Sequence, residues 1–291
     1  MIYLKSLVLP TDEQEYDVIL REKRSFHNSV YPFKIFPQKD LSRIEFDNIT
    51  MFCGGNGSGK STLINILGQI LCAERCSKFN DSPFFDRFAD LCTVKFVRTA
   101  ERSRVLTSDD VFDYALSARF VNEQLDHRRD ELLQKYIAVH RDFHNNGDMK
   151  RLKSLDDYER WSETMDILSP RHSQASLIRN RVVQNVDLYS NGQTAMHYFM
   201  ERIEEDGIYL LDEPENSLSV EYQLQLADFI EATARSTRSQ FIIATHSPIF
   251  LAMHGARIYN LDDDPASVCT WTELPNVRKF YDFFMDHRHE F

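Results

Sequence analysis

The chain has 291 residues, 42% of them hydrophobic, and a formal net charge of −11 at pH 7. This length allows one large α/β domain or two small ones, and the acidic balance disfavours a protein coated with phosphate-binding cations, although it leaves room for a local basic groove. No stretch approaches the roughly 18 apolar residues of a membrane-spanning helix, and Asp12 and Glu13 come too early for a secretory signal. The five cysteines form no CxxC pair. We therefore expect a cytoplasmic protein without membrane insertion or a disulfide framework.

The first 50 or so residues mix short β-prone runs with Pro and Asp. Residues 1–4 and 30–33 are two such runs. Pro and Asp interrupt strands and favour turns, so this region predicts an N-terminal antiparallel β edge that leads into the residues after it.

A glycine-rich run follows, in which four of the chain's nine glycines lie between residues 54 and 59. Residues 54–61 satisfy the pattern GxxxxGK[ST] in full, and the pattern is typical of a nucleotide phosphate cradle. Only glycine lets the backbone turn so tightly that successive N–H groups converge on the phosphates. Lys60 would neutralise phosphate charge and Ser61 would ligate Mg²⁺. The predicted ATP-binding residues of this loop are Gly54, Asn56, Gly57, Ser58, Gly59, Lys60, Ser61 and Thr62.

The flanks of this loop supply the structural context that the pattern requires. Residues 49–53 form an apolar, β-prone run, and Leu63, Ile66, Leu67 and Ile70 follow at helical spacing. Strand, loop and helix occur in the order of a P-loop, so the positive end of the helix adds to the anion site.

The middle of the chain changes to polar, helix-favouring stretches at 119–143 and 150–167, with a break at Asn145-Asn146-Gly147. Their acidic and basic residues are roughly balanced, which favours solvated helix faces over a binding arm. We expect one domain over 1–291 with a helical subdomain inserted at about 105–190. Near its end, a polar turn at 188–195 leads into a predicted helix at 196–203.

The next strand, at 208–211, ends in the adjacent carboxylates Asp212 and Glu213. Parallel strands place their carboxyl ends at the ligand crevice of an α/β sheet. Asp212 can therefore reach the metal near Ser61, while Glu213 acts as a general base or positions the attacking water. An amphipathic helix at 219–233 and a strand at 241–244 complete a βαβ unit, which implies a parallel sheet.

The strand at 241–244 is followed by Thr245-His246-Ser247-Pro248. This order places the His246 imidazole in the same crevice as Asp212 and Glu213. An imidazole there can hydrogen-bond the γ-phosphate and so sense whether it is present.

The order and spacing of four motifs resemble those of the ABC-type ATPases. The motifs are the phosphate loop, the SxGQ turn at 190–193, the DEP run at 212–214 and the THSP run at 245–248. Within that group the likeness is closest to small, stand-alone bacterial predicted ATPases of the AAA/ABC-like kind, which are related to SMC-type ATPase heads. It covers about 10–60 and 186–291. The resemblance implies an α/β P-loop NTPase fold with a mainly parallel sheet, and ATP with Mg²⁺ as cofactors.

The resemblance also implies a homodimer that forms on ATP binding. Ser190, Gly192 and Gln193 would contact the γ-phosphate of ATP held by a second subunit, although Tyr189 and Asn191 depart from the usual LSGGQ. The run 216–219 occupies the place of the dimer-contacting D-loop. No glutamine follows the strand after the first helix, so Asp109 is the stand-in for a water-mediated Mg²⁺ ligand.

The leading functional hypothesis is an ATPase that switches a dimer between closed and open states and acts on a partner protein or a nucleic acid, in a process such as phage defence or DNA maintenance. The alternatives are the ATPase subunit of a membrane transporter and a nucleotide-gated sensor module with little turnover. Two groups of cations are candidates for nucleic-acid contacts, although ordinary surface residues are the favoured interpretation: Arg98, Arg102, Arg104, Arg171, His172, Arg179 and Arg181.

Overall fold

The computed structural model describes residues 2–21, 29–146, 162, 164, 165, 167 and 191–291, with side chains except at 140–146 and 191. Contacts divide the chain into two units, Met1–Asp113 with Ser190–Phe291 and Tyr114–Tyr189. The first unit contains both sheets. Helix α4, Ser108–Asn146, begins in the first unit and continues into the second. None of the helices described has the length and apolar composition needed to cross a membrane.

The larger sheet has six strands in the order β5-β6-β7-β3-β8-β9. All neighbours are parallel except β8 and β9, which confirms the predicted P-loop NTPase fold with a mainly parallel sheet. The strands are β3 (Ile49–Cys53), β5 (Arg102–Thr107), β6 (Gly207–Asp212), β7 (Gln240–Ala244), β8 (Arg257–Asn260) and β9 (Ser267–Cys269). Asp212 lies opposite Ala244 in the ladder, and Phe52 lies opposite the same residue from the other side. The carboxyl ends of these strands therefore meet at one edge.

The N-terminal antiparallel strands form a separate sheet of three strands in the order β2-β1-β4. Their bounds are β1 (Leu4–Val8), β2 (Arg43–Glu45) and β4 (Thr93–Phe96). The β-prone run at 30–33 is not a strand, so that prediction is wrong. Pro32 has no N–H to donate to a ladder, and the run forms a turn in which the Phe33 N–H donates to the Val30 carbonyl at 3.0 Å.

Gln240 joins the two sheets. Its Oε1 accepts from the N–H groups of Tyr3 and Leu4 at 3.0 and 2.9 Å, and its Nε2 donates to the carbonyls of Leu4 and Asp47 at 2.9 and 3.0 Å. The side chain is fully buried. Since buried polar groups are costly when unpaired, this one amide fixes the start of β1 against the strand that leads to His246.

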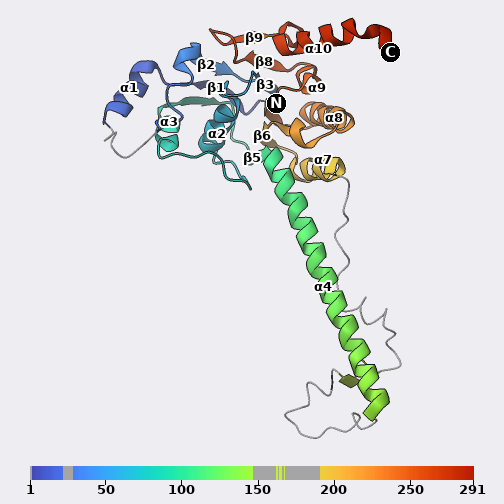
Figure 1. The fold of residues 1–291 in the computed structure, drawn as a ribbon. Helices are drawn as coiled ribbons and strands as arrows, with labels where there is room; N and C mark the ends of the chain where they lie inside the picture. The colour runs from blue at the N-terminus through green and yellow to red at the C-terminus, as the bar shows by residue number, and fades with distance from the viewer. Residues whose placement is uncertain (1, 22–28, 147–161, 163, 166, 168–190) are drawn as a thin grey trace. The chain divides into compact units, whose positions relative to one another are not determined.

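Helices cover both faces of the larger sheet, with α2 on one side and α7, α8 and α9 on the other, while α3 packs against α2 (Figure 1). Their bounds are α2 (Lys60–Ile70), α3 (Phe85–Leu91), α7 (Asn191–Arg202), α8 (Val220–Ser236) and α9 (Pro248–Leu251). Leu63, Ile64, Ile66 and Leu67 of α2 are fully buried, as the predicted helical spacing requires. The remaining helical segments of this unit are α1 (Asp12–Arg21), η2 (Pro37–Lys39), η5 (Pro214–Ser217), η6 (Trp271–Glu273), α10 (Pro275–Asp286) and η7 (Arg288–Glu290).

Two predicted helix boundaries differ from the structure. The helix predicted at 196–203 begins earlier, at Asn191, so the polar turn supplies the first residues of the helix itself. The helix predicted at 119–143 is part of the longer α4, which starts directly after β5 at Ser108 and ends at Asn146. Most of the predicted helix at 150–167 lies outside the described residues.

Candidate functional site

The phosphate loop connects β3 to α2 at the carboxyl edge of the larger sheet. Gly57 and Gly59 have φ values of 81° and 100°, a left-handed conformation that side chains rarely adopt. A Cβ on Gly59 would also lie 3.2 Å from Ile35 and Phe36. Helix α2 begins at Lys60 with Gly59 as its N-cap, so unpaired N–H groups and the positive end of the helix face the loop.

Lys60 is buried inside this loop, with 4% of its side chain exposed. Its Nζ donates to the carbonyls of Gly54 and Gly55 at 2.8 and 3.1 Å and lies 3.5 Å from Oε1 of Glu213. The ammonium is thus held between the loop and the carboxylate that follows β6. A phosphate group entering the loop would meet a cation already in place.

Ser61 and Asp212 face each other across the crevice. The Ser61 hydroxyl donates to Oδ1 of Asp212 at 3.0 Å, although the two residues are far apart in the sequence. Burial raises the pKa of Asp212 to about 6, with Glu213 adding to the rise and the Ser61 hydrogen bond opposing it. Asp212 is therefore harder to ionise than an exposed carboxyl, and a cation beside it would favour the ionised form.

A cavity of about 440 Å³ opens beside these two residues. Its lining combines carboxylates, hydroxyls, amides and cations: Tyr31, Ser61, Asn65, Arg75, Ser77, Lys78, Phe79, Asn80, Thr107, Ser108, Asp109, Asp212, Glu213 and Asn216. Among the described residues there is no group of three or more His, Cys, Asp or Glu side chains that could hold a metal by themselves. Magnesium, however, is usually held by one or two protein oxygens together with phosphate oxygens and water. The Ser61 hydroxyl and the Asp212 carboxylate fit that mode.

Asp109 lines this cavity and is exposed. Its neighbour Asp110 is buried instead and accepts from the N–H groups of Ser77 and Thr107 at 2.7 and 2.8 Å. Asp110 therefore fixes the junction between β5 and α4. Asp109, in the first turn of α4, borders the cavity.

Glu213 has a left-handed backbone conformation with a φ of 47°, which is uncommon for a residue with a side chain and recurs at functional sites. The Asn216 amide donates to its Oε2 at 3.0 Å. The half-exposed His246 ring lies nearby, with Nδ1 at 3.9 Å from Oε1 of Glu213. The structure thus brings Lys60, Glu213 and His246 together at one edge of the sheet.

Glu215 is a residue that sequence reasoning missed. Its Oε1 accepts from the Thr245 hydroxyl at 2.7 Å and from the N–H groups of His246 and Ser247 at 2.7 and 3.2 Å, and lies 3.2 Å from Nδ1 of His246. Its Oε2 is buried without a hydrogen-bond partner in the described structure. One buried carboxylate therefore holds the turn that carries His246. Little in the sequence indicates this role of Glu215, because a second acidic residue after a strand usually lies in solvent.

For the nucleotide hydrolysis that the sequence predicts, we expect Glu215→Ala to lower the rate about tenfold, and we expect it to lower the stability by about 1–3 kcal/mol for each buried N–H left unpaired. Glu215→Gln keeps one accepting oxygen and should lose less on both counts. Steady-state turnover and thermal unfolding of the two variants measure these effects. An unchanged rate in Glu215→Ala would show that the position of His246 does not depend on this carboxylate.

Arg75 and Asp262 are two further side chains at this site that no local pattern revealed. Both terminal nitrogens of Arg75 donate to Oδ1 of Asn65 at 3.2 Å, and its guanidinium lies 4.2 Å from the centre of the Phe79 ring. Burial lowers the pKa of Arg75. Asp262, after β8, accepts from the Gly55 N–H with both oxygens, at 2.9 and 2.8 Å. The phosphate loop is therefore fixed from the far end of the chain.

The described lining of the cavity includes neither Gly192 nor Gln193. Gly192 lies in the first turn of α7, where a Cβ would approach the Tyr222 ring to 2.5 Å, and Gln193 is exposed. Close packing between α7 and α8 explains the glycine. Ser190 lies outside the described residues.

Of the predicted cationic candidates, Arg102 and Arg104 lie in the first half of β5, and Arg98 follows β4. Arg102 forms an ion pair with Glu204, and Arg104 pairs with Glu74 and Glu204 at 2.8 and 2.7 Å. The Arg98 guanidinium lies 5.7 Å from the centre of the Tyr3 ring. Carboxylates therefore already neutralise two of these arginines. Arg171, His172, Arg179 and Arg181 lie outside the described residues.

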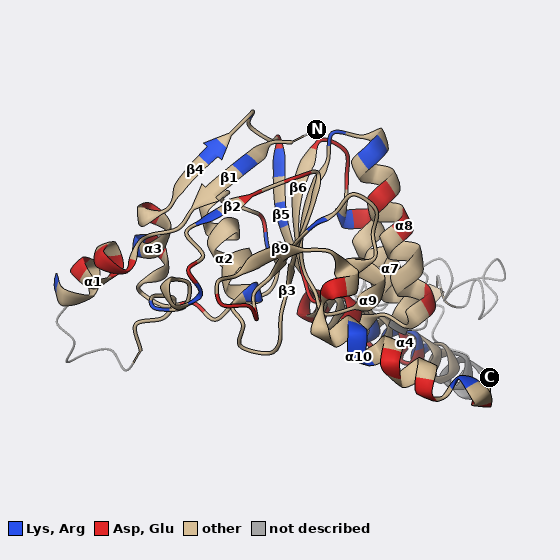
Figure 2. Ribbon diagram, turned by 90° about the horizontal axis from the view of Figure 1, so that it is seen from above, with Lys and Arg blue, Asp and Glu red and all other residues tan. Residues whose placement is uncertain are grey.

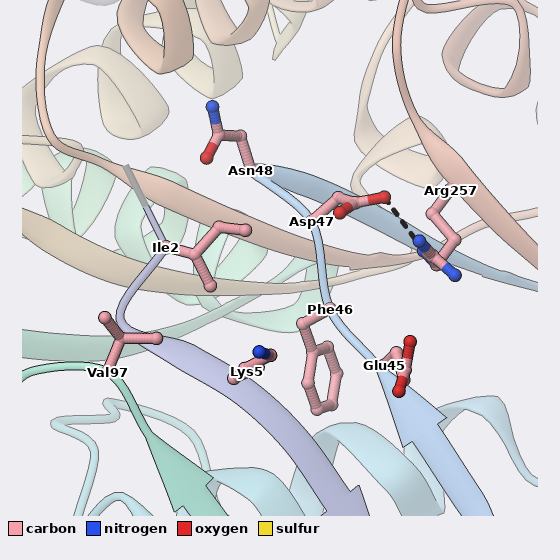
Figure 3. Close-up of a pocket in the computed structure, with 8 residues that line it drawn as sticks. All are labelled: Ile2, Lys5, Glu45, Phe46, Asp47, Asn48, Val97 and Arg257. Carbon is pink, nitrogen blue, oxygen red and sulfur yellow. Dashed lines mark hydrogen bonds and ion pairs between the residues drawn. The ribbon is translucent and has the colours of Figure 1, made fainter.

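A second cavity, of about 480 Å³, lies among the loops at the amino ends of β3 and β8 (Figure 3). Lys5 faces Phe46 there, and Nε of Arg257 is 2.8 Å from Oδ2 of Asp47. This ion pair offsets the charge of Arg257. The motif residues Ser61, Asp212 and Glu213 line the other cavity, at the carboxyl edge of the larger sheet.

Two family models match the chain on either side of its helical middle. The model described as "AAA domain, putative AbiEii toxin, Type IV TA system" matches residues 190–252, and the model described as "P-loop containing region of AAA domain" matches residues 29–83. The first range contains Asp212, Glu213 and His246, and the second contains Lys60 and Ser61.

Among curated proteins, the chain is similar to an uncharacterised ABC transporter ATP-binding protein/permease of Saccharomyces cerevisiae, with 25% identity over 253 residues. The match covers 82% of this chain and 18% of that protein, so the chain spans less than a fifth of its length.

Two solved structures are also similar. One is the Smc head domain of Pyrococcus furiosus with an extended coiled coil bound to the C-terminal domain of ScpA, at 14% identity and a TM-score of 0.42, covering 99% of this chain and 100% of that chain. The other is the SMC head domain of Thermotoga maritima, at 14% identity and a TM-score of 0.40, covering 92% and 99%.

Proposed function

Because the chain is an ATPase-type P-loop domain of the AAA and ABC kind, we propose that it binds ATP with Mg²⁺ and hydrolyses the nucleotide to ADP and phosphate. The observation that carries this proposal is the 3.0 Å contact between Ser61 and Asp212 beside the cavity at the carboxyl edge. It joins the metal-binding positions of two motifs that are distant in sequence. At the same edge, Nζ of Lys60 lies 3.5 Å from Oε1 of Glu213.

In this proposal the residues of the site divide the chemistry between them. The loop N–H groups and Lys60 hold the β- and γ-phosphates, and Ser61 and Asp212 would hold Mg²⁺, which neutralises phosphate charge when bound. Asp109 would be a further ligand through water. Glu213, oriented by Asn216, accepts a proton from the attacking water as the bond to the ADP oxygen breaks. His246, held by Glu215, hydrogen-bonds the γ-phosphate.

ATP would also act as the bridge of a homodimer. We propose that Ser190, Gly192 and Gln193 contact the γ-phosphate bound by the other subunit, since the start of a helix offers N–H groups to an anion. A ligand shifts an assembly equilibrium only through contacts that one state makes and the other lacks. Hydrolysis removes the bridging phosphate and releases the subunits.

The assembly can be tested with the hydrolysis-blocked variant Glu213→Gln. It is expected to form a larger assembly with ATP and Mg²⁺ than without them, as measured by light scattering. Ser190→Arg places bulk and charge at the proposed contact, so it should block this change while ATP binding is retained. Ser236→Arg, the same substitution at an exposed position of α8, is the control.

Two results would contradict this model of assembly. If Ser236→Arg blocks dimerisation as strongly as Ser190→Arg, the effect is not specific to the turn. If the protein has the same mass with and without ATP, and if Ser190→Arg hydrolyses ATP at the normal rate, the two subunits do not share an ATP site. The hydrolysis rate of Glu213→Gln would still test the role of Glu213 within each subunit.

The ATP cycle is proposed to act in the cytoplasm on a partner protein or a nucleic acid. The description of the family model that matches residues 190–252 names a putative toxin of a toxin–antitoxin system, which supports a defence-related process over transport. The ion pairs of Arg102 and Arg104 favour a protein partner at the amino edge of the sheet.

A further inference from the structure

Helix α10, Pro275–Asp286, exposes an unusual amount of aromatic surface near the end of the chain. Phe280, Phe283 and Phe284 are 52%, 55% and 54% exposed. The helix is anchored at its start, where Leu274 and Val277 are buried, and from there it runs to the C-terminal segment (Figure 1). Large apolar patches of this kind mark interaction sites in soluble proteins.

The exposed phenylalanines lie on one side of the helix. With 3.6 residues per turn, Phe280, Phe283, Phe284 and His287 fall within roughly 100° of the helix surface. Phe283 and His287 already pack against each other, with ring centres 4.5 Å apart. This spacing of three and four residues is the pattern of a helix that packs on another helix.

Two residues of opposite charge, Lys279 and Asp286, lie along one edge of this aromatic side. Lys279 and Asp286 are seven residues apart, which places them roughly 20° from each other around the helix. Both are exposed, and neither has an ion pair within the described structure. Lys279 and Asp286 thus lie toward the two ends of one stripe, and Figure 2 shows basic and acidic segments along α10.

A single helix of this length is marginal in water unless its apolar side is covered. We infer that α10 is covered by α10 of a second copy of this chain, in an antiparallel pair about a two-fold axis near residues 282 and 283. In this arrangement Phe280 lies opposite Phe284 of the partner subunit, and Lys279 lies opposite Asp286 of the partner subunit. The two-fold axis forms each of these contacts twice.

The charges select this orientation. In a parallel pair the two-fold axis runs along the helices, so the edge that carries Lys279 and Asp286 lies on opposite flanks in the two copies and these charges do not meet. The antiparallel pair brings the two edges together, so that Lys279 meets Asp286 of the partner subunit at both ends of the interface. The stripe is therefore complementary to itself, which is the property required of a two-fold interface.

The test is a charge swap followed by sedimentation velocity in the absence of nucleotide. Lys279→Glu and Asp286→Lys each replace two attractions by two repulsions, so each should raise the dimer dissociation constant at least about tenfold. The double variant Lys279→Glu/Asp286→Lys restores opposite charges and should dimerise like the original protein. Arg278→Glu, on the opposite side of α10, is the matched control and should have no effect.

The same series in a Lys60→Ala background separates this interface from any assembly that depends on ATP. Any of three results would overturn the proposal. The protein could be a monomer at all concentrations, Arg278→Glu could raise the dimer dissociation constant as much as the single charge swaps do, or the double variant could fail to dimerise. An exposed aromatic helix can also bind a lipid surface. Flotation with vesicles of phosphatidylglycerol and phosphatidylethanolamine tests this alternative. Vesicle binding by a protein that remains monomeric would assign the stripe to a lipid surface instead.

Discussion

The Glu213→Gln protein is expected to bind ATP with nearly unchanged affinity and to hydrolyse it at least about 100-fold more slowly, since a positioned base contributes a factor of this size. The amide cannot accept the proton of the attacking water. The substitution keeps the shape of the side chain, and an amide can still meet the Asn216 and Lys60 groups that contact the carboxylate. Phosphate release under single-turnover conditions separates the chemical step from nucleotide binding.

Glu205→Gln is the matched control for this experiment. Glu205 is exposed before β6, at the end opposite the site, so the same loss of charge should leave the rate unchanged. Near-normal turnover of Glu213→Gln would mean that another group activates the water, and it would leave the proposed ATP binding at Lys60 intact. No turnover in the unaltered protein, with strong ATP binding, would favour the sensor module.

Lys60→Ala is expected to weaken ATP binding about 100-fold, because a charge-assisted contact to phosphate is worth up to about 3 kcal/mol. The structure adds a second cost, since the carbonyls of Gly54 and Gly55 lose their donor and Glu213 loses the cation beside it. Titration calorimetry with ATP and Mg²⁺ measures the affinity, and thermal unfolding measures the stability of the empty loop.

Lys95→Ala, at an exposed position of β4, removes the same charge elsewhere and should not change ATP affinity. If the Lys60→Ala protein remains folded and binds ATP as tightly as the original, the glycine-rich loop is not the phosphate site. A protein that unfolds instead can be examined as Lys60→Met, which keeps the apolar part of the side chain.

Local patterns in the sequence were sufficient to predict the phosphate loop and the central strands at 49–53, 208–211 and 241–244. The phosphate loop requires glycine at particular φ values, and the strands ending at Asp212 and Ala244 are apolar runs of the right length. Each of these features depends on neighbouring residues alone. The parallel arrangement of the sheet followed from the rules for βαβ units, whereas the strands β8 and β9 and the order of all six strands were not predicted.

Distant contacts whose residues belong to no motif were not predicted. Glu215 acts on a turn about thirty residues later, and Asp262 reaches the phosphate loop from the far end of the chain. Arg104 appeared available in the sequence because its partner Glu204 is a hundred residues away. The third strand of the smaller sheet likewise comes from residues after α2. No spacing rule connects such pairs, because only the tertiary fold brings them together.

The position of β3 in the larger sheet has a consequence for synthesis of the chain. This strand carries the phosphate loop and lies between β7 and β8, which leave the ribosome long after it does. During translation the strand therefore has neither of its neighbours, and its closing contacts are among the most distant in the chain. The larger sheet of this unit can be completed only when nearly the whole chain has been made. An interrupted translation product would hold the phosphate-loop sequence without a working nucleotide site.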